Sequence, residues 1–106
     1  MPQNRKRERK RSGGNVFRDI GFSSKEAKHL LIRSDLMIRL QEVIRSRDLT
    51  QAQVAQILQV SQPRVSDVLR GRIDLFSTDT LIDMLDDLGV TVQFVVKPIR
   101  RRRKVA

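Results

Sequence analysis

The chain has 106 residues, of which 39% are hydrophobic, and a net charge of +10, which allows one compact domain with short tails. It has no cysteine and only one histidine, so cysteine nucleophiles and thiolate metal sites are excluded and an enzyme is disfavoured. No apolar run reaches the ~18 residues of a membrane span, and no signal-peptide pattern opens the chain. We therefore expect a cytoplasmic protein with no cofactor and no membrane partner.

The positive charge is concentrated at the two ends of the chain. Six of the seven residues from Arg5 to Arg11 are basic, and six more basic residues follow from Lys97 to Lys104. The polar, like-charged composition of residues 1–14 predicts a flexible arm, and residues 98–106 are predicted to form a basic tail. Two roles are open for both ends: general attraction to polyanions, or insertion into the minor groove of DNA.

Charge is also uneven between these ends. Residues 64–72 contain three arginines, whereas residues 74–87 contain five aspartates and no basic residue. This asymmetry predicts one face that attracts phosphate and another that repels it.

The first predicted helix follows an apolar patch near the start of the body. The patch consists of Val16, Phe17, Ile20 and Phe22. Ser23 and Glu26 then fit a capping box, in which each side chain accepts a hydrogen bond from the other residue's backbone N–H. The helical spacing of apolar residues that follows predicts a helix that either runs to about Arg47 or restarts at Ser34.

Three shorter helices are predicted next. Thr50 and Gln53 fit a second capping box, and the apolar pattern that follows is interrupted at Gln59 and Val60. A further helix is expected over about residues 62–70, since Ser61 can cap it, Pro63 suits a first turn and Gly71 suits a left-handed C-terminal cap. Ser77 begins a last helix, with Leu81, Leu85 and Leu88 facing inward and Gly89 at its end.

The period of the sequence changes after Gly89. From Val90 to Lys97 the apolar residues alternate and β-branched residues dominate, which predicts a strand. An isolated strand needs a partner for its backbone groups. The strand is expected either to cover its own domain or to pair with a second chain.

The helix over residues 62–70 has a polar face that suits the major groove of DNA. With Val65 at the centre of the buried stripe, Val68 and Leu69 lie beside it. The predicted base-contacting residues lie outward or on the flanks: Gln62, Pro63, Arg64 and Asp67. Glutamine can bind adenine, arginine guanine and aspartate cytosine, while a proline ring can pack on the methyl group of thymine.

The segment LTQAQVAQILQVSQPRVSDVLRG, from Leu49 to Gly71, resembles the Xre helix-turn-helix of lambda-repressor-like proteins. In that family the position of Gln51 contacts the DNA backbone, and the position of Arg70 contacts a phosphate. We predict backbone contacts from the polar residues around both helix starts and beyond the second helix: Thr50, Gln51, Ser61, Ser66, Arg70 and Arg72. One departure is Gln59, since the turn often carries glycine with a positive φ, and a non-glycine there costs about 1 kcal/mol.

The wider strings NVFRDIGF, RSDLMIRL, SQPRVSDVLRG and DLFSTDTLIDML resemble the HigA-like antitoxins over about residues 14–96. The resemblance implies an all-α bundle of about five helices with a short C-terminal strand, here residues 15–97. It also implies a homodimer that binds operator DNA, represses its own promoter and neutralises a RelE-like, mRNA-cleaving toxin. Partner contacts are predicted at Val16, Phe17, Ile20, Phe22, Val92 and Phe94.

Three other interpretations remain beside the antitoxin. A solitary prophage-type Xre regulator would use the same DNA-binding residues without a toxin partner. The helix pair could also bind RNA, or it could be a plain helical hairpin whose caps and apolar spacing serve only the core.

Overall fold

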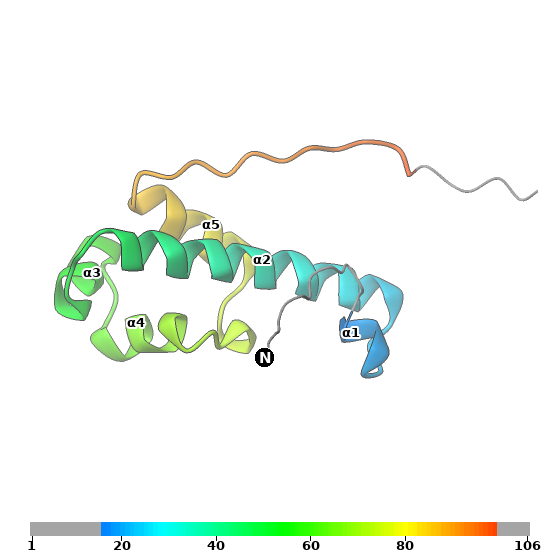
Figure 1. The fold of residues 1–106 in the computed structure, drawn as a ribbon, viewed down its shortest axis with the longest axis horizontal. Coiled ribbons are helices and arrows are strands. Elements are labelled where there is room, and N and C mark those ends of the chain that lie inside the picture. The colour runs from blue at the N-terminus through cyan, green and yellow to red at the C-terminus, as the bar shows by residue number, and fades with distance from the viewer. Residues whose placement is uncertain (1–15, 100–106) are drawn as a thin grey trace, which may run out of the picture.

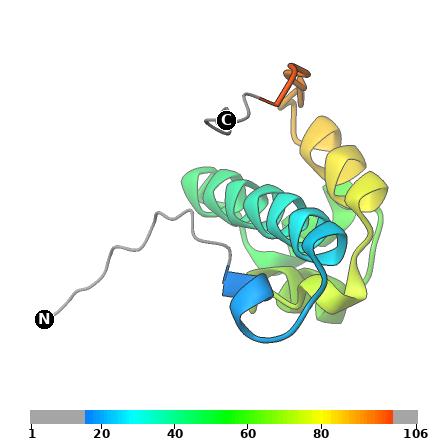
Figure 2. The same cartoon turned by 90° about the vertical axis from the view of Figure 1, so that its right-hand side faces the viewer.

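One long helix forms the spine of the fold, and the shorter helices pack around it (Figure 1). The computed structural model describes residues 16–99. In chain order the helices are α1 (Val16–Asp19), α2 (Ser24–Ser46), α3 (Gln51–Leu58), α4 (Gln62–Leu69), the 3-10 turn η1 (Ile73–Leu75) and α5 (Thr78–Asp87). Helix α4 and helix α5 lie on different sides of α2, as both views show (Figures 1 and 2).

The predicted capping box sets the start of α2. The Ser23 hydroxyl accepts a hydrogen bond from the Glu26 N–H, and the Glu26 carboxylate accepts one from the Ser23 N–H, both at 3.1 Å. The helix then continues without a break to Ser46, so the predicted long helix is confirmed and a restart at Ser34 is wrong.

The core lies where α2 meets α3, α4 and α5. Helix α2 contributes Leu36, Met37, Leu40 and Ile44, and α5 contributes the inward-facing Leu81 and Leu85 that the spacing predicts. Met84 of α5 is also buried, and the remaining buried members come from the other helices and the connections: Val54, Ala55, Leu58, Val65, Val68, Phe76 and Leu88. Burial of these apolar side chains is the main favourable term in folding, and it holds α3 and α4 against α2.

The expected C-terminal strand does not form. Residues 90–99 are extended, but no other segment within residues 16–99 supplies a strand for their backbone groups. Val90 and Val92 pack against the core, whereas Phe94, Val95 and Val96 extend past it and are exposed. Alternation of β-branched residues favours an extended backbone, but a strand also needs a neighbour.

The predicted bundle of about five helices with a strand is therefore corrected to four helices of eight or more residues, α2 to α5, within residues 16–99. Val16–Asp19 forms a single helical turn, and Ile73–Leu75 a 3-10 turn. No helix in this part of the chain is long and apolar enough to cross a membrane. The predicted arm over residues 1–14 and the basic run from Arg100 lie outside the described residues.

Candidate nucleic-acid interface

Helices α3 and α4 form a compact pair joined by a tight turn. The capping box at the start of α3 is confirmed, with the Thr50 N–H donating to the Gln53 side chain at 2.8 Å. Gln59 ends α3 with φ of +58°, and the Val60 N–H donates to the Ala55 carbonyl at 2.9 Å. The left-handed position that glycine often fills is thus occupied by glutamine in this turn, as the sequence predicts.

Both ends of α4 are held in place. At its start the Ser61 hydroxyl accepts a hydrogen bond from the Arg64 N–H at 3.3 Å, and Pro63 occupies the first turn. At its end the Gln41 amide of α2 donates to the Val68 carbonyl at 2.9 Å. Gly71 follows with φ of +73°, and a Cβ there would lie 3.3 Å from the Gln41 amide nitrogen. The chain therefore reverses closely against α2 and fixes the direction of α4.

The outer face of α4 carries most of the predicted base-contacting residues. Val65 and Val68 are fully buried, as the helical periodicity predicts, while Gln62 and Pro63 are exposed at the first turn. Ser66 and Asp67 are half-buried on the same helix. The predicted backbone-contacting residues Thr50, Gln51 and Ser61 are also exposed. The two helix starts thus present polar side chains and backbone N–H groups, which is the arrangement that favours an anionic ligand.

Arg64 is predicted to contact a base, but its side chain has partners within the protein. Its guanidinium donates to the Leu75 carbonyl at 3.0 Å, and its central carbon lies 4.0 Å from the centroid of the Phe76 ring. Phe76 is only 2% exposed and is therefore fixed in the core. Through these two contacts Arg64 connects the start of α4 to the segment around η1. No local feature of the sequence indicates this contact, because the partners Leu75 and Phe76 lie eleven and twelve residues further along the chain, in an irregular connection.

The other two arginines near α4 have carboxylate partners. Arg70 forms an ion pair with Asp67 at 2.6 Å, and Arg72 forms one with Asp74 at 3.3 Å. The hydrogen bond from Arg72 lowers the pKa of Asp74, and the same bond raises the pKa of Arg72. Both guanidinium groups are open to water, which screens such ion pairs and keeps them weak. A phosphate can therefore compete with either carboxylate for its arginine.

The aspartates of α5 lie away from this surface. Asp79, Asp83, Asp86 and Asp87 are exposed on α5, which lies on another side of α2 from α4 (Figures 1 and 2). The predicted charge asymmetry therefore corresponds to two separate faces. A polyanion that approaches α4 meets little of the repulsion that α5 would cause.

The predicted partner-contacting residues fall in two places. Val16, Phe17, Ile20 and Phe22 form a hairpin at the start of α2, where the Phe17 and Phe22 rings meet edge to face with centroids 6.2 Å apart. Ile20 is 67% exposed. Val92 and Phe94 lie on the C-terminal extended segment, on the opposite side of the bundle from α1 (Figures 1 and 2). The structure does not bring these two sets together.

Comparisons with known proteins agree with the geometry of α3 and α4. Residues 16–97 match the sequence model of a family described as "Helix-turn-helix domain". A solved structure assigned provisionally to the XRE family of transcriptional regulators is 30% identical, with a TM-score of 0.68. The alignment covers 76% of this chain and 91% of that chain. The chain matches no curated protein.

Proposed function

Because the chain belongs to the helix-turn-helix domain family, we propose that it is a transcriptional regulator that binds specific double-stranded DNA through α3 and α4. The observation that carries the proposal is the first turn of α4, where Gln62 and Pro63 are exposed while Val65 holds the opposite side of the helix in the core. In helix-turn-helix proteins the N-terminal residues of the second helix contact base edges in the major groove. The similarity of this chain to the solved structure of the XRE family supports the same assignment.

The base contacts are assigned to the residues that α4 presents outward. Gln62 can bind adenine with two hydrogen bonds, Pro63 can pack on a thymine methyl group, and Asp67 can accept a hydrogen bond from cytosine once Arg70 turns to a phosphate. Arg64 could reach a guanine only by leaving Phe76 and the Leu75 carbonyl. In the free protein it acts as a positioning residue that fixes the angle of α4.

Phosphate contacts are assigned to the residues that surround α4. Thr50 and Gln51 lie at the start of α3, and Ser61 lies at the start of α4, where backbone N–H groups favour anions. Ser66 lies on α4, and Arg70 and Arg72 lie beyond its last turn. On binding, both arginines would exchange a carboxylate partner for a phosphate, which costs little because both guanidinium groups are open to water.

Selection of bound fragments from a pool of random double-stranded DNA tests this proposal. We expect one enriched sequence, bound at least about a thousandfold more tightly than a scrambled duplex of the same length at physiological salt. Arg70→Ala should weaken the binding of both duplexes alike and reduce the salt dependence by about one unit of slope. Equal affinity for the enriched and scrambled duplexes would contradict sequence-specific binding. Tighter binding of an RNA duplex would favour the RNA-binding interpretation.

A second candidate function is that of an antitoxin that represses its own operon and neutralises a RelE-like toxin. The observation that favours it is the α1 hairpin, where Val16, Ile20 and Phe22 are more than two-fifths exposed although DNA binding does not need them. An amphipathic segment of this kind can pack into an apolar groove of a partner protein. A solitary regulator accounts equally for α3 and α4, so the α1 hairpin is where the two functions differ.

Co-expression with the product of the adjacent reading frame distinguishes the two functions. An antitoxin should co-purify with a small ribonuclease at a salt concentration that removes DNA, and Ile20→Asp should abolish the complex while DNA binding is retained. Lys25→Asp, an exposed change just beyond the hairpin, is the control. If no neighbouring product binds, the solitary regulator is the better account.

A further inference from the structure

The short connection between α2 and α3 carries backbone strain. Asp48 has φ of +54°, in the left-handed region that a non-glycine residue rarely adopts. Within residues 16–99 the other non-glycine residue with a positive φ is Gln59, which follows α3. The two strained residues therefore bracket α3, the helix whose start is expected to meet the DNA backbone. A conformation of this kind persists where the surrounding contacts hold it in place.

The residues on both sides of Asp48 are held by distant parts of the fold. Leu49 packs against the buried core, and Thr50 then begins α3 with its capping box. On the other side, the Arg47 guanidinium donates a hydrogen bond of 2.6 Å to the carbonyl oxygen of Leu88. This bond joins the end of α2 directly to the end of α5.

The way in which α5 ends leaves the Leu88 carbonyl available for this bond. Gly89 has φ of +84°, and its N–H donates to the Asp86 carbonyl at 2.9 Å. The Val90 N–H donates to the Leu85 carbonyl, also at 2.9 Å. These two bonds form a Schellman motif, in which the carbonyl of the residue before the glycine lies beyond the closed turn. The Leu88 side chain is buried, so the core fixes the position of the acceptor.

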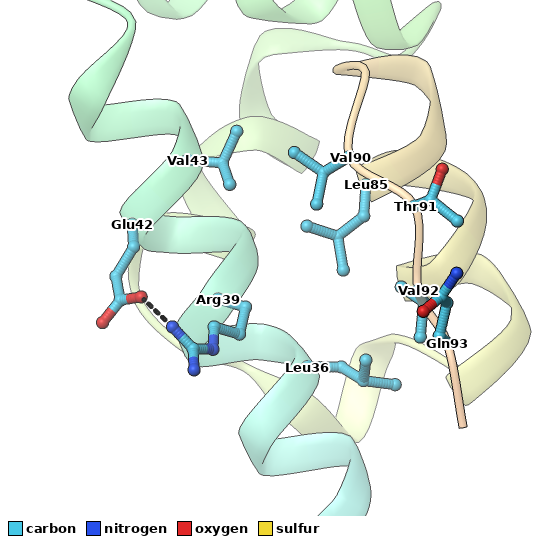
Figure 3. Close-up of a pocket in the computed structure, with 9 residues that line it drawn as sticks. All are labelled: Leu36, Arg39, Glu42, Val43, Leu85, Val90, Thr91, Val92 and Gln93. Atoms are coloured by element: carbon cyan, nitrogen blue, oxygen red, sulfur yellow. Dashed lines mark hydrogen bonds and ion pairs between the residues drawn. The ribbon is translucent and has the colours of Figure 1, made fainter. Parts of the chain in front are cut away.

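An open groove separates α2 from the segment that follows α5 (Figure 3). It encloses about 380 Å³, and its apolar lining comes from both sides: Leu36, Val43, Leu85, Val90 and Val92. The ion pair at its rim, between Arg39 and Glu42, lies within α2 and does not cross the groove. Unfilled space supplies no van der Waals contacts. Beside the groove, the hydrogen bond from Arg47 thus provides a link between α2 and the end of α5 that side-chain packing does not.

We propose that Arg47 is a positioning residue for α3. By holding the Leu88 carbonyl it keeps the connection at Asp48 in its left-handed conformation, and it thereby keeps Thr50 and Gln51 where they can meet a phosphate. The effect on DNA rests on the proposed function, whereas the effect on α3 does not. Arg47 itself bonds to the end of α5, which lies on another side of α2 from α4 (Figures 1 and 2). Without the bond the connection samples other conformations, and the apparent dissociation constant for DNA rises as the competent fraction falls.

Amide hydrogen exchange of the full chain, measured by nuclear magnetic resonance, tests the effect on α3 without DNA. The reporters are the amides of Gln53 and Val54, which donate to the Thr50 side chain and carbonyl in the first turn. In Arg47→Ala they should exchange at least about threefold faster than in the natural chain, relative to the Val65 amide in the first turn of α4. Arg47→Lys keeps a donor and should recover most of the protection. Unchanged exchange in a folded Arg47→Ala variant would overturn the proposal.

DNA binding by the same variants tests the consequence for function. Arg47→Ala should raise the dissociation constants of the enriched and scrambled duplexes alike, by about three- to tenfold, because α3 contacts the backbone and not the bases. Arg39→Ala is the matched control, since it removes the same charge from α2 but lies at the groove rim, and it should change both constants less than about twofold. Equal losses in the two variants would overturn the assignment to position and indicate an effect of charge. If the natural chain binds no DNA, the proposed function fails, and amide exchange still decides whether Arg47 holds α3.

A glycine at position 48 separates positioning from a direct phosphate contact by Arg47. Glycine adopts the left-handed conformation without strain, so Asp48→Gly should restore part of the DNA affinity that Arg47→Ala loses. The change also removes a negative charge, and the same substitution in the Arg39→Ala background measures that contribution. We expect the gain in affinity to be at least about twofold larger in the Arg47→Ala background. The same gain in both backgrounds would show that Arg47 does not act through the connection, and it would overturn the proposal.

Discussion

Gln62 is the residue that most directly tests how α4 meets DNA. It is exposed in the first helical turn, and its removal leaves the core unchanged. We expect Gln62→Ala to weaken binding to the enriched DNA sequence by about 1 to 3 kcal/mol and to leave random DNA almost unaffected, because a bidentate contact to adenine carries sequence information. Fluorescence anisotropy with the two duplexes measures both values.

The control for this prediction is Gln56→Ala, an exposed glutamine in the second half of α3, which should alter neither affinity. Equal losses on both duplexes with Gln62→Ala would show that this side chain contacts the backbone and not a base.

Arg64 should behave as a positioning residue. Its guanidinium is bonded to the Leu75 carbonyl and stacks on Phe76, so Arg64→Ala removes one hydrogen bond and one cation-π contact. We expect a loss of about 1 to 2 kcal/mol in the free energy of unfolding, measured by urea denaturation. DNA affinity should fall for enriched and random duplexes together, since the angle of α4 changes.

Arg64→Lys is the informative companion, because a lysine keeps the charge but loses the planar stacking. Full retention of stability in both variants, with loss only on the enriched DNA, would show that Arg64 reads a base instead.

At the level of the elements, the turn after α4 is the most constrained connection. Gly71 has φ of +73° and faces the Gln41 amide that bonds to the end of α4, so Gly71→Ala brings both backbone strain and crowding. We expect a loss of about 1 to 3 kcal/mol in the free energy of unfolding. Gly89→Ala is the matched control, since φ is +84° there but nothing lies within 4 Å of the added Cβ.

The control should lose only the part that is due to backbone strain. If the two alanine variants are equally stable, the contact between Gln41 and the turn contributes nothing, and the direction of α4 must be set by the core alone.

The helices could be predicted from the sequence because their signals are local. The capping boxes at Ser23 and Thr50, the serine caps at Ser61 and Ser77, and Gly71 all act within four residues of the helix end. The spacing of apolar residues then identifies the buried faces.

What the sequence could not supply depends on contacts between distant segments. The predicted strand over residues 90–97 is wrong. Alternation of apolar residues favours an extended backbone, but a strand also requires a neighbouring strand, which residues 16–99 do not provide. The position of Arg64 could not be predicted either, since it depends on Phe76 reaching the core after an irregular connection. Both cases are decided by tertiary packing.

For the whole molecule, the separation of charge links the fold to the proposed function. The acidic face on α5 lies away from α4, so the field near α4 is dominated by arginines and by the starts of two helices. Their carboxylate partners Asp67 and Asp74 lower the net charge of this face in the free protein. Additional attraction for DNA must then come from charge elsewhere in the chain.

The basic run from Arg5 to Arg11 is the largest source of such charge at the N-terminal end of the sequence. Deleting residues 1–12 should lower the affinity for DNA mainly at low salt, because the binding of these cations releases counterions from the phosphates. The salt dependence should fall by up to about five units of slope, as the deletion removes six basic residues and one acidic residue. The melting temperature should hardly change, since the buried residues within the described range 16–99 run from Ala27 to Leu88. Deleting only residues 1–4, which carry no charged side chain, is the control and should leave the salt dependence unaltered. If the longer deletion lowers the melting temperature by several degrees, the arm packs on the domain and its effect on DNA cannot be assigned to charge alone.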